Sequence, residues 1–178
     1  YTADLEPKGA LVAKVVRSTI ANGVVKGFDL EAALAVPGVV KIVTCFDVPD
    51  YQFPTAGHPW SVETAHQDIA DRKLLNTRVR VYGDDIAAVV AEDEISAARA
   101  ARLVMVEYEE YPPLLTPEEA LAEGAPRLHD EKPGNLIAHS GFKLGELSYE
   151  EAVEEEGLVV IDKKYGTQSV QHCHIETP

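Results

Sequence analysis

The chain has 178 residues, of which 46% are hydrophobic, so it is long and apolar enough to fold around a core of its own. We expect one domain, or one domain with an extension. The 30 acidic residues outnumber the 16 basic ones and give a net charge of −14. That charge repels phosphate backbones and anionic lipids, so neither nucleic acid nor a membrane surface is an expected partner.

The first elements expected along the chain are two strands and a short helix. Residues 10–17 and 24–28 have strand-like composition, and Asn22–Gly23 between them favours the positive φ of a hairpin turn. We therefore expect these two strands to pair with each other. Asp29 is expected to cap a short helix that ends before Pro37.

A strand at 39–45 leads into a long segment, 47–67, that is rich in Pro, Gly, His and aromatic residues. Loops of this length in compact domains are usually functional or lie under a partner. His58 and His66 flank Trp60, which could hold a ligand by stacking. The simpler interpretation is a rigid ordered loop that buries its own aromatic ring.

The segment 79–112 predicts two strands around a tight turn, then a helix and a third strand. Gly83–Asp84 supplies the turn, because Gly tolerates positive φ and Asp hydrogen-bonds to nearby backbone. The unbroken apolar run 86–91 is typical of a strand covered on both faces. Asp93 can cap the helix that follows. The expected core residues of this segment are Ile86, Val89 and Val90.

Two capping boxes mark helices in the second half of the chain. Thr116–Glu119 opens one helix, and Ser148–Glu151 opens another that is expected to reach about Glu156. The sequence between these helices, 125–145, has loop composition. An apolar run then predicts a long strand over 158–171.

Several of these pieces also carry a family resemblance. Gly83–Asp84, the run 87–91, residues 106–109 and Pro112 resemble the opening α/β hammerhead domain of molybdenum hydroxylase large subunits, the xanthine dehydrogenases and aldehyde oxidases. The final segment 171–176 most resembles bacterial purine-oxidising xanthine dehydrogenases. Further matching pieces occur in the family's order at residues 1–4, 13–14, 16–18, 37–39, 47–49 and 116–121, and Asp85 departs from the Pro more often found there.

The resemblance implies an α/β (α+β) fold with a mixed sheet and short helices. It implies a hammerhead domain over 1–145. Residues 146–178 would then be a connecting helix and the first strand leading into the molybdenum-cofactor-binding domain. The only methionine is Met105, so we expect a processed chain or an excised piece of a larger protein.

The resemblance also implies an activity for the parent protein. That enzyme would hydroxylate purines or related heterocycles, or oxidise aldehydes, with water as the oxygen source. It would use molybdopterin-bound molybdenum, with 2Fe-2S clusters and FAD on partner subunits or domains. The chain itself is expected to be structural and inactive, with no catalytic residue and no metal ligand, in a cytoplasmic protein.

The most tempting metal pair lies near the end of the chain. His172 and His174 at i and i+2, with Glu176, would project from one face of a strand. A metal site also needs oriented supporting groups, which nothing in the sequence guarantees. The resemblance instead implies that Gln171, His172 and Glu176 help to shape the cofactor pocket.

The remaining polar candidates have simpler interpretations. Asp84–Asp85 resembles a carboxylate pair, but adjacent turn residues diverge, so a role in turn geometry is expected. His129 and His139 lie in polar loop sequence and are expected to be solvated. Cys45 and Cys173 form no metal motif or disulfide framework and are expected to be reduced thiols.

Two alternatives to the enzyme-domain hypothesis stay open. The chain could be a stand-alone module that binds a small ligand or metal through the His58–Trp60 loop or through the strand that carries His172 and His174. It could also be a purely structural adaptor. The sequence contains no glycine-rich phosphate loop, Gly-X-Ser-X-Gly motif or His-Glu-X-X-His motif that would favour another enzyme class.

Overall fold

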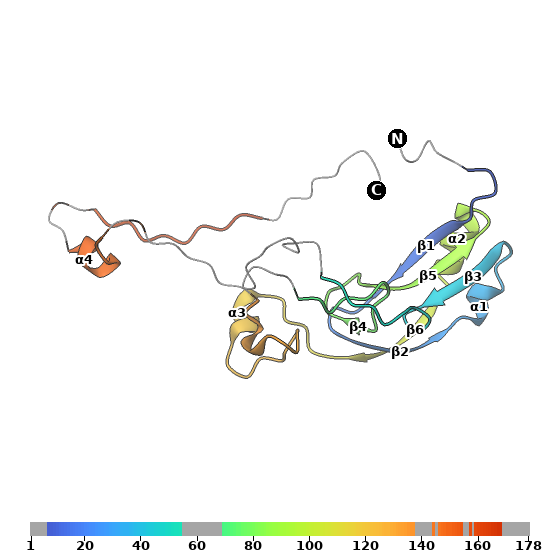
Figure 1. Ribbon diagram of the computed structural model, residues 1–178, viewed down its shortest axis with the longest axis horizontal. Helices are drawn as coiled ribbons and strands as arrows, with labels where there is room; N and C mark the ends of the chain where they lie inside the picture. The colour runs from blue at the N-terminus through green and yellow to red at the C-terminus, as the bar shows by residue number, and fades with distance from the viewer. Residues whose placement is uncertain are drawn as a thin grey trace. The chain divides into compact units, whose positions relative to one another are not determined.

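The chain divides into two compact units in the computed structural model (Figure 1). One unit is formed by residues 7–139, and the other combines 1–6 with 140–178. The residues that the structure describes are 7–54, 69–137, 144, 146–154, 157 and 159–168.

The unit 7–139 contains a three-stranded antiparallel sheet in the order β1-β5-β3 (Figure 1). These strands are β1 (Val12–Arg17), β5 (Asp85–Ala91) and β3 (Val39–Thr44). The helix α2 (Glu94–Ala101) contacts all three strands, and α1 (Glu31–Leu34) lies beside β3 and α2. The apolar run of β5 is therefore the central strand of this sheet, as its composition predicts.

A second antiparallel sheet has the order β4-β2-β6. Its strands are β4 (Arg78–Val79), β2 (Gly23–Asp29) and β6 (Met105–Glu110). Helices and strands occur together, so the α/β (α+β) class is confirmed. Each strand pairing is antiparallel, so two antiparallel sheets replace the mixed sheet expected from the sequence.

The predicted hairpin between the first two strands is wrong. β1 pairs with β5, whereas β2 pairs with β4 and β6, so the two strands belong to different sheets. Gly23 is the first residue of β2, and a Cβ there would overlap the backbone carbonyl of Glu109 on β6. The glycine is needed for close approach of another strand rather than for a turn, and a local turn signal cannot distinguish these two uses.

The core of this unit lies along β5 and beneath α2. Ile86 and Val89 are fully buried, whereas Val90 is only partly buried. The expectation that Val90 is core, and that β5 is covered on both faces, therefore fails within the described residues. Asp93 caps α2 as predicted, since its carboxylate accepts a hydrogen bond from the Ser96 amide at 2.9 Å. The buried small residues of α2 are Ala97 and Ala100.

The remaining helix signals agree closely with the structure. Asp29 accepts a hydrogen bond from the Glu31 amide at 3.1 Å at the start of α1, although Leu30 holds the N-cap position. Both predicted capping boxes form, at Thr116 and at Ser148. They open α3 (Pro117–Leu121) and α4 (Tyr149–Val153), and a short 3₁₀ helix spans Pro133–Asn135. The helix α4 is shorter than expected, because it ends at Val153.

The predicted strand over 158–171 is absent from its described part, residues 159–168, which have no regular secondary structure. No described strand pairs with this segment, so its backbone lacks the ladder hydrogen bonds that a strand requires. Apolar composition predicts a strand only where a neighbouring strand is available to pair with it. Among the described residues, no helix has both the length and the apolar character needed to cross a bilayer.

Candidate functional site

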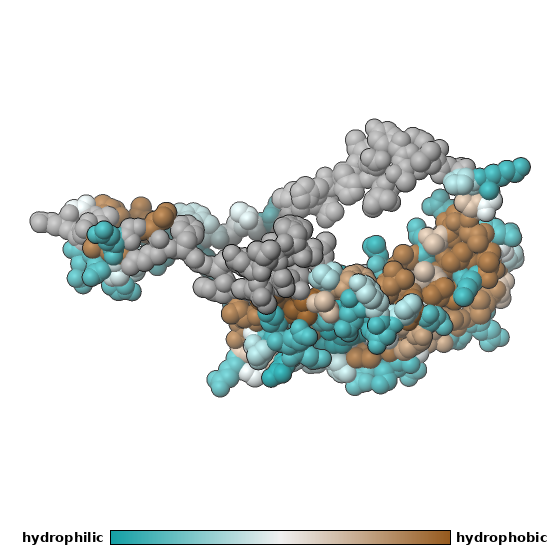
Figure 2. All heavy atoms as spheres, in the orientation of Figure 1, coloured by the Kyte–Doolittle hydropathy of each residue, from teal (hydrophilic) through white to brown (hydrophobic). Residues whose placement is uncertain are grey.

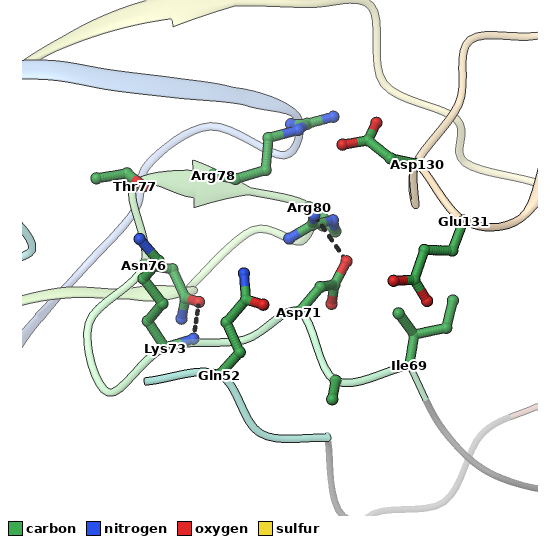
Figure 3. Close-up of a pocket in the computed structure, with 11 residues that line it drawn as sticks. Gln52, Ile69, Asp71, Lys73, Asn76, Thr77, Arg78, Arg80, Asp130 and Glu131 are labelled. Atoms are coloured by element: carbon green, nitrogen blue, oxygen red, sulfur yellow. Dashed lines mark hydrogen bonds and ion pairs between the residues drawn. The ribbon is translucent and has the colours of Figure 1, made fainter. Parts of the chain in front are cut away.

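A polar cavity of about 210 Å³ opens beside β4 in the unit 7–139 (Figure 3). Its wall comes from β4, from the segment that leads into it, and from a turn about 50 residues further along the chain. Three cationic and three acidic side chains line it together with amides. The charged and amide lining residues are Gln52, Asp71, Lys73, Asn76, Arg78, Arg80, Asp130 and Glu131.

An ion-pair chain closes one side of the cavity. Asp71 Oδ2 lies 2.7 Å from Arg80 Nη2 and 2.7 Å from His129 Nδ1. Arg80 Nε also donates to the Leu128 carbonyl at 2.7 Å. These contacts join the segment around His129 to Arg80, which directly follows β4. The buried Asp71 Oδ1 atom has no hydrogen-bond partner among the described residues.

The predicted solvation of His129 is therefore wrong. Its side chain is about one-fifth exposed and contacts Asp71, which is 58 positions away in the chain. Nothing in the local sequence around either residue indicates this pairing. Asp71 and Arg80 were likewise not recognised from the sequence, because no motif spacing marks a contact that only the tertiary fold creates.

Asp84 organises the turn on the other side of the cavity wall. Its carboxylate accepts hydrogen bonds from the Arg80 amide at 2.8 Å and the Val81 amide at 3.3 Å, and it pairs with Arg72 Nη2 at 3.2 Å. Ser18 Oγ accepts hydrogen bonds from the amides of Gly83 and Asp84. The turn role predicted for Asp84 is confirmed, and its 6% exposure shows that it is a buried structural carboxylate.

Asp85 does not share the site of its neighbour. It forms an exposed ion pair with Arg17 at 3.3 Å, across the β1–β5 pairing. The two carboxylates thus diverge, as the turn hypothesis predicts. They form no acid–base pair of the kind that uses two converging carboxyl groups.

Arg78 is a partly buried cation of the cavity. Its Nη1 donates to the Gly23 carbonyl at 2.9 Å and to the Val79 carbonyl, and its guanidinium lies 5.4 Å from the centre of the Tyr111 ring. Burial, together with the nearby charge of Arg80, lowers the pKa of Arg78. Arginine remains protonated under any ordinary condition, so this cation keeps its charge.

The polar, charged lining is suited to holding a small charged ligand or a partner side chain. Among its charged lining residues, Asp71 pairs with Arg80, and Lys73 pairs with Asp50 outside the lining. The described residues contain no group of three or more His, Cys, Asp and Glu side chains that could hold a metal ion.

The site candidates proposed from the sequence near the end of the chain, Gln171, His172, His174 and Glu176, lie outside the described residues. The same holds for the other histidine candidates, for the loop tryptophan and for the second cysteine: His58, Trp60, His66, His139 and Cys173. Of the two predicted free thiols, Cys45 is described; it is buried and unpaired. Burial raises the pKa of its thiol to about 11, with a smaller contribution from the charge of Asp47.

Residues 1–112 match the family described as the α/β hammerhead domain of aldehyde oxidase and xanthine dehydrogenase. The chain belongs to this family. The match covers well over half of the chain and includes both three-stranded sheets. The hammerhead resemblance drawn from the sequence is thereby confirmed.

Individual relatives of this hammerhead chain agree with the family match. It is 43% identical over 177 residues to the xanthine dehydrogenase molybdenum-binding subunit of Escherichia coli O157:H7. The fold resembles quinoline 2-oxidoreductase from Pseudomonas putida 86, with a TM-score of 0.65 and 34% identity over 78% of the chain and 17% of that protein. It also resembles the aldehyde oxidoreductase of Desulfovibrio gigas, with a TM-score of 0.62 and 34% identity over 72% of the chain and 14% of that protein.

The hammerhead chain spans only a part of these relatives. The alignment with the Escherichia coli subunit covers 99% of the chain but 23% of that protein. The relatives that match it are molybdenum-dependent oxidoreductases, so the chain corresponds to one domain of such an enzyme family.

Proposed function

We propose that the chain forms the opening hammerhead domain of the large, molybdenum-binding subunit of a xanthine dehydrogenase-type oxidoreductase. The observation that carries this proposal is the 43% identity over 177 residues to a xanthine dehydrogenase molybdenum-binding subunit. The alignment extends beyond residues 1–112 into the second unit of the chain. It therefore supports an assignment of the whole chain, and not of the two sheets alone.

The parent enzyme hydroxylates a purine or a related heterocycle, and the oxygen comes from water. Electrons leave through a pterin-bound molybdenum centre to 2Fe-2S clusters and FAD on partner subunits or domains. A purine substrate is favoured over an aldehyde because the relative named above is a xanthine dehydrogenase, and xanthine is a purine. We place the enzyme in the cytoplasm, where a thiol such as Cys45 stays reduced.

Within that enzyme, residues 1–145 form the hammerhead domain and residues 146–178 lead into the cofactor-binding domain. Gln171, His172 and Glu176 belong to the outer wall of the cofactor pocket. Among the described residues, Asp71 is engaged by Arg80 and His129 in a structural network, and no group of three or more His, Cys, Asp and Glu side chains could hold a metal ion. We propose that the chain on its own is an inactive structural part, without bound molybdenum.

One experiment tests this proposal on the natural protein. The complete gene that encodes the chain is expressed with an affinity tag, together with the genes of its partner subunits, in a host that makes molybdopterin. The product is expected to be about four times longer than this chain, since the chain spans 23% of its relative. Elemental analysis should find molybdenum, and the enzyme should reduce an electron acceptor with xanthine or hypoxanthine.

The 178-residue chain, expressed alone in the same host, is the matched control. It is expected to contain no molybdenum and to oxidise neither purines nor aldehydes. Stoichiometric molybdenum in the isolated chain would contradict the structural role. A complete gene product of only 19.3 kDa would contradict the large-subunit assignment.

A further inference from the structure

The sheet β1-β5-β3 has an apolar face that the described residues leave uncovered. The register pairs Ala13 with Val90 and Val15 with Ala88, while Val43 pairs with Ala88 from the other side. Directly opposed residues of antiparallel strands project from the same face of a sheet. These five residues therefore share one face, and we call them the open face.

The opposite face of the same sheet is covered. Val16, Ala87 and Val89 alternate with the open-face residues along β1 and β5, and all three are buried. The helix α2 contacts the strands, and its own buried residues are alanines that permit close packing. The sheet is thus a two-layer structure with helices on one side.

The open face remains accessible along much of β1. Val15 is 43% exposed, Ala13 is exposed, and the remaining three residues are partly buried. In Figure 2, hydrophobic atoms gather over the part of the molecule where Figure 1 shows β1, β5 and β3. The one charged residue in register with these positions is Lys41, opposite Val90.

This composition is unusual for a sheet face in contact with water. An antiparallel sheet that is solvated on one side alternates apolar residues toward the core with polar residues toward solvent. Here the outward positions of β5 are Ala88 and Val90, and those of β1 are Ala13 and Val15. Contiguous apolar patches of this kind mark surfaces that another structure covers.

We propose that the open face is the surface on which the rest of the large subunit docks. This inference rests on the proposed function. The chain spans 23% of its xanthine dehydrogenase relative, so more than three quarters of such a polypeptide lies outside it. The occupant is an apolar surface of that remaining polypeptide. A second copy of the chain is disfavoured, because two chains that each carry a net charge of −14 repel one another.

Cysteine labelling tests the proposal in the complete gene product. Ala13→Cys and Val15→Cys place a thiol on the open face. Arg99→Cys is the control, since Arg99 is an exposed residue of α2, on the other side of the sheet. Each purified variant is treated with a maleimide, and labelling at the introduced position is followed by peptide mass spectrometry.

Labelling of Ala13→Cys and Val15→Cys is expected to be at least about tenfold slower than labelling of Arg99→Cys in the complete subunit, because a docked surface reacts only when it opens. In urea the three variants should label alike. In the 178-residue chain, both open-face positions should label as fast as the control.

Equal labelling of all three positions in a long, molybdenum-containing subunit would overturn the inference and leave the proposed function intact. Protection in the 178-residue chain that increases with its concentration would assign the open face to a second copy, which also overturns the proposal. A complete gene product of only 19.3 kDa would overturn the proposed function and this inference together.

Discussion

The two units of the chain carry equally clear helix-capping signals but differ in how much of their described sequence is buried. Capping boxes form both at Thr116 in the unit 7–139 and at Ser148 in the other unit. The first unit has a core that includes the fully buried Ile86, whereas none of the described residues from 144 to 168 is buried. Capping therefore starts a helix in either place, but only long-range pairing and burial make a unit resistant to unfolding.

The largest difference between the units should appear at matched isoleucines. Ile86 is 0% exposed in β5, and Ile161 is 72% exposed. We expect Ile86→Ala to lower the free energy of unfolding by about 2–5 kcal/mol through lost burial and a cavity. Ile161→Ala should change it by less than about 0.5 kcal/mol. Urea denaturation of both variants checks this, and equal effects would show that the second unit has a core of its own.

Two glycines, one in each unit, compare the cost of backbone strain in the two units. Gly83 has a φ of +93°, and a Cβ added there would meet no atom within 4 Å; Gly166 is equally unobstructed but has no such φ. Gly83→Val should cost about 1–3 kcal/mol of strain. Gly166→Val should leave the same denaturation curve unchanged. A Gly83 variant as stable as the parent would argue against the tight turn before β5.

Two N-cap residues give a smaller contrast. Asp93 accepts hydrogen bonds from the Ser96 amide at 2.9 Å and the Ser96 hydroxyl at 2.7 Å, at the start of a helix that contacts the sheet. Asp93→Ala should lower the free energy of unfolding by about 1 kcal/mol. Ser148→Ala should alter helicity near residue 150 without moving the global transition. Circular dichroism with denaturant melts separates the two results.

The last expected effect is a pH dependence of the unit 7–139 that is absent at neutral pH and appears only above about pH 9. Cys45 is 5% exposed, and burial raises the pKa of its thiol from 9.0 to about 11. Because the folded pKa lies above the unfolded one, its contribution to stability is constant below pH 9.0 and declines as pH rises toward about 11. Denaturant melts across this range should show a steeper decline for the parent than for Cys45→Ala. Parallel curves would contradict the burial of the thiol.

The local features of the first unit were predictable from sequence because neighbouring residues create them. The turn at Gly83, the cap at Asp93 and the box at Thr116 each depend on contacts within a few residues. Predictions from the sequence fail where the contacting residue is distant in the chain. The Asn22–Gly23 signal predicted a hairpin, but Gly23 is required by the close approach of β6, almost 90 positions away.

The same distinction between local and distant contacts holds for the candidate site. The turn role of Asp84 could be predicted, because its carboxylate accepts hydrogen bonds from amides three and four residues earlier. The pairing of Asp71 with His129 could not, since it joins segments 58 residues apart. No sequence spacing carries that information, because side-chain proximity of this kind arises only when the sheets and loops have assembled.

By itself, the sequence determined the family, the α/β class and most element positions, because periodicity, capping and turn chemistry are local and the motif order is specific. Only the tertiary structure decided that β1 and β2 enter different sheets, that a polar cavity forms beside β4, and that the described residues leave one face of the sheet around β5 open. The physical reason is that strand partners and burial depend on long-range contacts. Similar apolar runs form a paired strand at 86–91 and remain outside any described strand at 159–161.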